Sequence, residues 1–100
     1  MIRHLVFWQL KETANNASKQ ENAEKLIEMF QSLKDKIPEL IEIESGLNFN
    51  DSPAAWDFAL NTVFYTKEEL DIYQAHPEHQ KIVAFVKTIV EDRCVVDYEF

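Results

Sequence analysis

The order of apolar patterns along the chain limits the fold more than any other feature. Four stretches rich in β-branched and aromatic residues alternate with two stretches of helical spacing, in the order β-α-β-β-α-β. We expect strands at residues 2–10, 40–50, 56–65 and 93–100, and helices at residues 18–37 and 66–90. This order predicts a ferredoxin-like α+β fold with a four-stranded antiparallel sheet. The length of 100 residues fits one domain, residues 1–100.

Local signals set the expected element boundaries. The S/T-x-x-E spacing of a capping box predicts helix starts at Ser18 and Thr66. Pro38 is expected to end the first helix and Pro77 to break the second, because the residue before a proline is disfavoured in helical geometry. The polar residues 12–17 are expected to form a loop.

The sheet is expected to need a partner. The first and third strands are apolar on both faces, so they should be central, with the other two strands at the edges. Two helices cover only one face, and the other face still carries either Trp8 and Leu10 or Leu5 and Phe7. Since large exposed apolar patches indicate association, we expect a homodimer whose two sheets pack face to face or close into an α+β barrel. A monomer with a slightly wet face is the alternative.

Charge and composition exclude several classes of partner. The net charge of −8 disfavours nucleic acid and anionic membrane, which both need a basic patch. The single cysteine, Cys94, cannot form an internal disulfide, and no apolar run reaches the roughly 20 residues that span a bilayer. The first residues lack a small-residue cleavage site, so we expect a cytoplasmic protein.

Several motifs carry a resemblance to a known family. They are Ile2-Arg3-His4-Leu5-Val6, Ile37-Pro38-Glu39-Leu40 with Gly46, Tyr73-x-x-His76-Pro77-x-His79 and Asp97-Tyr98. With these motifs in order over essentially all 100 residues, the chain resembles the stress-responsive A/B barrel (Dabb) family. The resemblance implies a dimeric α+β barrel. Members include plant stress-induced proteins, bacterial proteins without an assigned activity, and plant polyketide cyclases that perform an aldol condensation without a metal or organic cofactor.

The resemblance also implies candidate catalytic residues. The cyclase cavity is lined by a histidine of the first strand, a helical tyrosine and the second histidine of the His-Pro-x-His element, which match His4, Tyr73 and His79. A tyrosine on the first helix helps to shape the cyclase pocket. This chain has Phe30 at that place, and phenylalanine cannot donate a hydrogen bond.

An aldol-type cyclisation needs a base that removes a proton next to a carbonyl and a donor that holds the enolate oxygen. Histidine, with an ordinary pKa of about 6.5, suits both roles. His79 is the candidate base, and His4 or Tyr73 the candidate donor. His4 shares an apolar strand face, where burial would keep the imidazole neutral.

Each candidate also has a purely structural interpretation. His4 could be a core histidine bonded to a neighbour, Tyr73 a core residue, and His79 an exposed cap. His76 is expected to bond the backbone at the helix break and receives no catalytic role. The spacing of His76 and His79 is weak as a metal motif, because structural zinc needs four ligands, so we expect no metal and no cofactor.

Apolar residues from several elements are predicted to line a barrel cavity: Val6, Trp8, Phe30, Phe49, Phe64 and Phe85. Such a cavity suits a flat or acyl ligand of modest polarity. We therefore expect a protein that binds a small, mostly apolar ligand, with its activity unassigned. The alternative is a cofactor-free cyclase or lyase using His79, His4 and Tyr73. No motif of an antibiotic-biosynthesis monooxygenase is present, and a filled barrel with exposed histidines would instead indicate a structural role.

Overall fold

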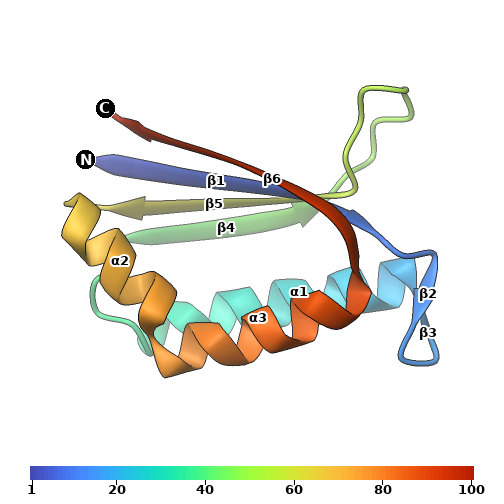
Figure 1. Ribbon diagram of the computed structural model, residues 1–100, viewed down its shortest axis with the longest axis horizontal. Helices are drawn as coiled ribbons and strands as arrows, with labels where there is room; N and C mark the ends of the chain where they lie inside the picture. Colours follow the sequence, from blue (N-terminus) through green and yellow to red (C-terminus); the bar gives the residue numbers. More distant parts are fainter.

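The computed structural model describes residues 1–100 and places all the helices on one face of an antiparallel sheet (Figure 1). The elements are β1 (Ile2–Leu10), β2 (Thr13–Ala14), β3 (Ala17–Ser18), α1 (Lys19–Ser32), η1 (Leu33–Asp35), β4 (Glu42–Leu47), β5 (Phe58–Phe64), α2 (Lys67–Ala75), α3 (Pro77–Ile89) and β6 (Val90–Glu99). The four-stranded sheet has the order β4-β5-β1-β6. The predicted ferredoxin-like fold is confirmed, with the first and third predicted strands, β1 and β5, at its centre.

Strand β1 divides the sheet into two faces by simple alternation. One set of its side chains is buried beneath the helices, namely Ile2, His4, Val6, Trp8 and Leu10. Successive strand residues point to opposite faces, so the intervening residues face away from the helices. The structure thereby decides between the two sets of apolar residues left open by the sequence: Leu5 and Phe7 lie on the uncovered face.

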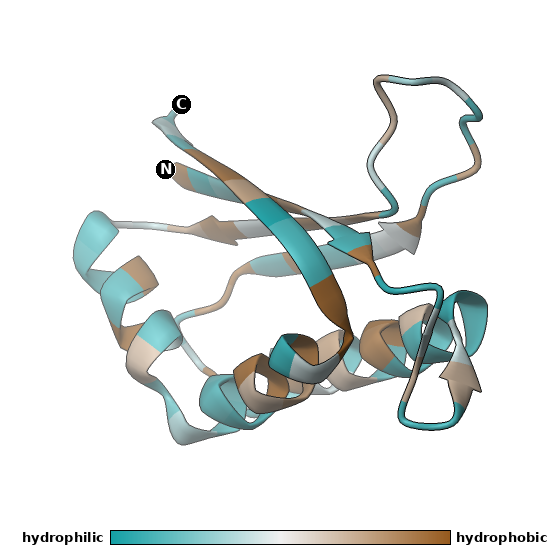
Figure 2. Ribbon diagram, turned by 45° about the vertical axis from the view of Figure 1, so that its right-hand side comes forward, coloured by the Kyte–Doolittle hydropathy of each residue, from teal (hydrophilic) through white to brown (hydrophobic).

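The register of the sheet sets which side chains meet. Trp8 pairs with Phe58 of β5 and with Arg93 of β6, while His4 pairs with Asp97 of β6. Hydrophobic and hydrophilic stretches follow one another along β6, which is an edge strand (Figure 2). Because paired residues of neighbouring strands lie on the same face, Arg93 and Asp97 share the helix-covered face with Trp8 and His4 of β1.

The core lies between the sheet and the helices. Eighteen buried residues form one hydrophobic cluster. The Trp8 ring stacks on Phe30 of α1 with centroids 5.9 Å apart, and Phe58 lies 5.8 Å from Trp8. These contacts hold α1 against the middle of the sheet and set one wall of the site described below.

Several predicted boundaries differ from the structure, two of them for clear local reasons. The α-helix ends at Ser32, before Pro38, because the backbone tightens into η1, where the amides of Lys36 and Ile37 both donate to the carbonyl of Leu33. Residues 12–17 contain a small β2–β3 hairpin instead of a plain loop. Asn15 and Asn16 have φ of 56° and 59°, the left-handed pair that a two-residue hairpin turn requires.

Candidate functional site

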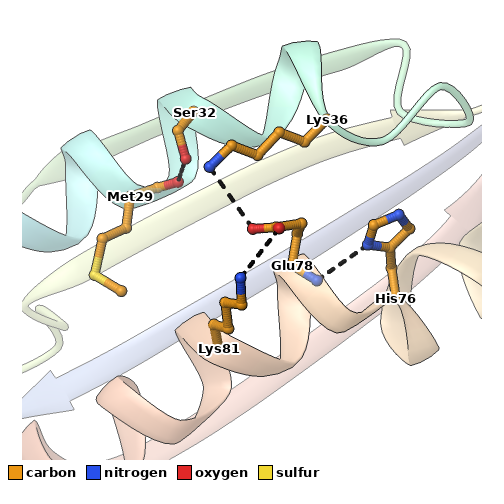
Figure 3. Close-up of polar contacts among 6 residues, drawn as sticks. All are labelled: Met29, Ser32, Lys36, His76, Glu78 and Lys81. Carbon is orange, nitrogen blue, oxygen red and sulfur yellow. Dashed lines mark hydrogen bonds and ion pairs between the residues drawn. The ribbon is translucent and has the colours of Figure 1, made fainter.

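The corner between α2 and α3 positions the functional side chains. His76 ends α2 and also caps α3, because its Nδ1 accepts a hydrogen bond of 3.1 Å from the backbone N–H of Glu78 (Figure 3). Pro77 occupies the first turn of α3, where its missing N–H costs nothing. His76 therefore bonds the backbone at the helix break, as the sequence analysis expected.

Glu78 fixes this corner to the rest of the fold. Its carboxylate lies 3.2 Å from Nζ of Lys81 in α3 and 3.6 Å from Nζ of Lys36, which follows η1 (Figure 3). The hydrogen bond from Lys81 and the charge of Lys36 hold the pKa of Glu78 below its usual value. The first turn of α3 is thereby tied to the segment that follows α1.

His79 and Tyr73 meet across the corner. Their ring centroids are 4.4 Å apart, and Tyr73 is fully buried, with a hydroxyl that has no hydrogen-bond partner. Burial raises the pKa of Tyr73, so the phenol stays protonated and remains a donor. The structure thus places one unpaired phenol donor beside a histidine.

Two features determine the state of His79. Its Nδ1 lies 3.0 Å from the carbonyl oxygen of Gln74, and a carbonyl only accepts, so Nδ1 carries the proton and Nε2 keeps its lone pair. Burial lowers the pKa of His79, which favours the neutral ring at pH 7. A neutral imidazole with a free Nε2 is competent as a base.

His4 has a different environment from the one expected. Its Nδ1 lies 2.5 Å from Oδ1 of Asp97, whereas the sequence analysis predicted apolar surroundings. That prediction is wrong because β6 pairs with β1 and places a carboxylate opposite a buried histidine. Since a carboxylate only accepts, Nδ1 donates to it, and this bond fixes the ring orientation and leaves Nε2 for another partner.

The two histidines open into one cavity. A cavity of about 310 Å³ lies between the sheet and the helices and is lined by thirteen residues, eight of them hydrophobic. His4 and His79 both line it, and Tyr73 contacts both rings without lining the cavity. The three candidate catalytic residues therefore come together, and the volume is at the small end of ligand pockets (roughly 300–1,000 Å³).

Half of the predicted ligand-binding residues line this cavity. Val6, Trp8 and Phe30 do so, but Phe49, Phe64 and Phe85 do not. Phe64 packs against Tyr73, with ring centroids 5.0 Å apart. The ammonium group of Lys25 lies over the ring of Phe85, 4.8 Å from its centroid.

Phe49 belongs to a different feature. It is fully exposed in the segment between β4 and β5, which projects away from the helices (Figure 1). Together with Leu5, Phe7 and Trp56 it lines a hollow of about 660 Å³ on the uncovered sheet face. The strand predicted at 56–65 starts only at Phe58, which leaves Trp56 in this projecting segment.

Four polar residues of the site were missed. Asp97 bonds His4, and Gln74, Lys87 and Arg93 line the cavity. For Arg93 and Asp97 one signal was available, since both belong to the polar face of the last strand. The other two lie on helices and carry no local sign of the cavity.

The structure offers no metal centre. No group of three or more His, Cys, Asp or Glu side chains could hold a metal ion. In addition, none of the helices has the length and the apolar character needed to cross a membrane.

Comparison with known proteins identifies the family. Residues 2–100 match the stress responsive A/B barrel domain, Dabb. The chain belongs to the Dabb family. An uncharacterised protein of Streptomyces coelicolor is 34% identical to this Dabb chain over 100 residues, which is the full length of both.

Solved structures share this fold. A dimeric ferredoxin-like protein of unknown function from Bacteroides fragilis is 29% identical, with a TM-score of 0.85 over 99% of this chain and 95% of the other. A hydroxynitrile lyase from Passiflora edulis is 20% identical, with a TM-score of 0.78 over 97% of this chain and 90% of the other. The second likeness establishes the fold alone.

Proposed function

We propose that this Dabb chain binds a small, mostly apolar carbonyl compound and transfers a proton at the carbon next to the carbonyl, using only its own side chains. The observation that carries the proposal is the pair of histidines that line one apolar cavity, with Nδ1 of His4 held by Asp97 and Nδ1 of His79 held by the carbonyl of Gln74. Two imidazoles oriented over one cavity provide a base and a group that binds the substrate oxygen.

His79 acts as the base. Its Nε2 lone pair removes the proton from the substrate carbon, and the electron pair of the C–H bond becomes the enolate double bond. The Nδ1 hydrogen bond to Gln74 holds the ring in the tautomer that this step requires. The apolar wall strengthens electrostatic interactions by excluding water.

His4 acts as the donor to the developing enolate oxygen. Asp97 occupies Nδ1 and orients the ring, so Nε2 is the nitrogen left for a substrate oxygen, to which it donates when it is protonated. Tyr73 packs against both imidazole rings and holds the only buried phenol donor of the site. The enolate can then attack a second carbonyl or release a leaving group, which gives cyclase or lyase chemistry.

A hydroxynitrile lyase has the same fold, so this fold is compatible with lyase chemistry. At 20% identity, that lyase's substrate is not transferred to this chain. The cavity chemistry here supports the reaction class alone.

The direct test is hydrogen–deuterium exchange at the α-carbon of a panel of β-keto esters and 1,3-diketones in D₂O, followed by proton NMR. We expect catalysed exchange for at least one compound and a loss of about 100-fold or more in His79→Asn, in line with general base catalysis. His76→Asn is the matched control, because asparagine also caps a helix and His76 lies outside the cavity. A compound that shifts the His79 resonances but exchanges no faster than in buffer would leave a binding protein and overturn proton transfer.

We also propose that the chain forms a homodimer through the uncovered sheet face. Leu5 and Phe7 lie on this face, where Val96 and Tyr98 of β6 remain 52% and 42% exposed. Solved relatives of this fold are described as dimeric. Light scattering at micromolar concentration should give twice the chain mass of 11.8 kDa, and a monomeric mass would refute the dimer.

A further inference from the structure

The basic side chains of this protein are almost all engaged. Of the ten lysines and arginines, four form ion pairs, two bond backbone carbonyls and two lie over aromatic rings. In the same order these are Lys19, Lys36, Lys67 and Lys81, then Lys11 and Lys34, then Lys25 and Arg3. With 18 acidic residues in the chain, intramolecular partners are plentiful.

The two remaining cations are Lys87 and Arg93, and both line the same cavity. Lys87 lies in the last turn of α3, and Arg93 lies on the helix-covered face of β6, just after α3 leads into this strand. Neither side chain has a carboxylate, carbonyl or aromatic partner. The charge of Arg93 contributes to lowering the pKa of His79, which places that charge toward the same space.

Position along the sheet separates these cations from the reactive groups. Arg93 is opposite Trp8, and Asp97 is opposite His4. The four-residue offset corresponds to roughly 13 Å of strand at 3.2–3.4 Å per residue. The backbone of Arg93 is thus set well apart from that of His4 and Asp97, and the apolar residues Val6, Trp8 and Phe30 line the same cavity.

We propose that Arg93 and Lys87 form a carboxylate-binding subsite, so that the ligand is a small acyl compound with an apolar middle and an anionic carboxylate end. A guanidinium binds a carboxylate through two parallel hydrogen bonds, and an ammonium adds a point charge. The orientation of the reacting carbonyl toward His79 rests on the proposed function. The binding of the carboxylate end does not depend on turnover.

The net charge of −8 supports the assignment of these two cations to an anion subsite. The overall field of the protein repels anions, so an anionic ligand needs a local source of positive charge. Lys87 and Arg93 provide that source in the wall of the cavity, and the other eight cations are already paired or engaged.

The test compares two nearly isosteric probes, 4-phenylbutanoate and 4-phenylbutanamide, by calorimetry and by NMR of the His79 ring. We expect the carboxylate to bind at least about tenfold more tightly than the amide, consistent with hydrogen bonds to charged groups. Arg93→Gln should remove most of this preference, and Lys87→Gln should reduce it by about threefold. Lys67→Gln is the matched control, because it loses the same charge at a paired residue outside the cavity.

Equal binding of the two probes by the unmodified protein would overturn the subsite, as would a carboxylate preference that survives in the double variant of Arg93 and Lys87. Amide binding that is unchanged in Arg93→Gln shows that the cavity is intact, so a loss of carboxylate affinity there supports the subsite. A carboxylate preference without any deuterium exchange would overturn the proposed function and leave the subsite standing.

Discussion

The two faces of the sheet differ in how deeply their side chains are buried, although both are formed by alternate residues of the same strands. On the covered face, Val6 and Trp8 are at most 5% exposed and pack against α1 and α3. On the uncovered face, Leu5 and Phe7 stay half-buried, and Val96 is 52% exposed. Hydrophobicity alone therefore does not decide which residues of the sheet are buried. Burial depends on which face the helices cover.

The polar groups on the two faces of the sheet can be compared in the same way. On the covered face the two histidines are bonded, His4 to Asp97 and His79 to the carbonyl of Gln74, while Nε1 of Trp8 and the hydroxyl of Tyr73 have no partner. On the uncovered face, Nε of Arg3 and Oδ1 of Asn61 also lack a partner. Buried polar atoms are normally bonded, so both faces hold polar atoms that a partner can satisfy, which we expect to be a ligand on the covered face and a second chain on the uncovered face.

The largest effect is expected from the packed face. Phe58→Ala should lower the free energy of unfolding by about 3–5 kcal/mol, because it opens a cavity beneath Trp8 and Phe30. Tyr65→Ala, at a position 65% exposed, should change it by less than about 0.5 kcal/mol. Urea unfolding followed by circular dichroism measures both. Equal losses would erase the distinction between the covered core and the surface.

The next effect concerns the uncovered face. Phe7→Glu should halve the mass seen by light scattering while the circular dichroism spectrum persists, because an unpaired carboxylate is costly to bury in an interface. Ile72→Glu makes the same exchange of an apolar residue for an acid at an exposed position of α2, and should leave the mass unchanged. A dimer that tolerates Phe7→Glu would place the interface elsewhere.

Within the site, Asp97→Asn should slow catalysed α-proton exchange by about 10- to 100-fold, because an amide accepts the Nδ1 hydrogen bond of His4 more weakly than a carboxylate and orients the ring less firmly. Asp71→Asn removes an exposed carboxylate from α2 and should have no effect. The two NMR exchange rates, measured at one pH, test whether His4 depends on its carboxylate. An unchanged rate in Asp97→Asn would refute the donor role.

The smallest effect is a pH dependence of stability. Burial lowers the pKa of His79 in the folded state, so its contribution is fully present above the unfolded value of about 6.5 and is lost as pH falls below it. The unmodified protein should therefore lose more stability than His79→Gln between pH 7.5 and pH 5. Thermal unfolding of the two proteins across this range measures the difference, and parallel curves would show that burial does not shift His79.

Local patterns were enough for much of the fold. The parity of residues along β1 separated the two sets of side chains that lie on opposite faces, without showing which set the helices cover. The Ser18–Glu21 capping box is present in full. At the second predicted box, Thr66 accepts from the amide of Glu69, but the Glu69 carboxylate bonds the amide of Tyr65 instead. A cap signal therefore located the helix start more reliably than it fixed each bond.

Long-range register explains what the sequence did not provide. His4 and Asp97 are 93 residues apart, and their contact depends on how β6 aligns with β1. Position on a strand face is readable from alternation, but the facing residue is not. The prediction that Phe49 lines the cavity failed for a similar reason. The alternation of apolar residues in β4 continues to Phe49 in the sequence, but the chain leaves the sheet after Leu47.

His76 ends one helix and starts the next. The relative positions of Tyr73 and His79 therefore depend on the number of residues between them. There is no loop between α2 and α3 to absorb an inserted or deleted residue, and each residue turns a helix by about 100°. One extra residue between Tyr73 and His79 would swing one ring away from the other. The six-residue interval should therefore be inherited more strictly than the identity of the residues within it, and length variation among relatives should accumulate in the projecting segment between β4 and β5.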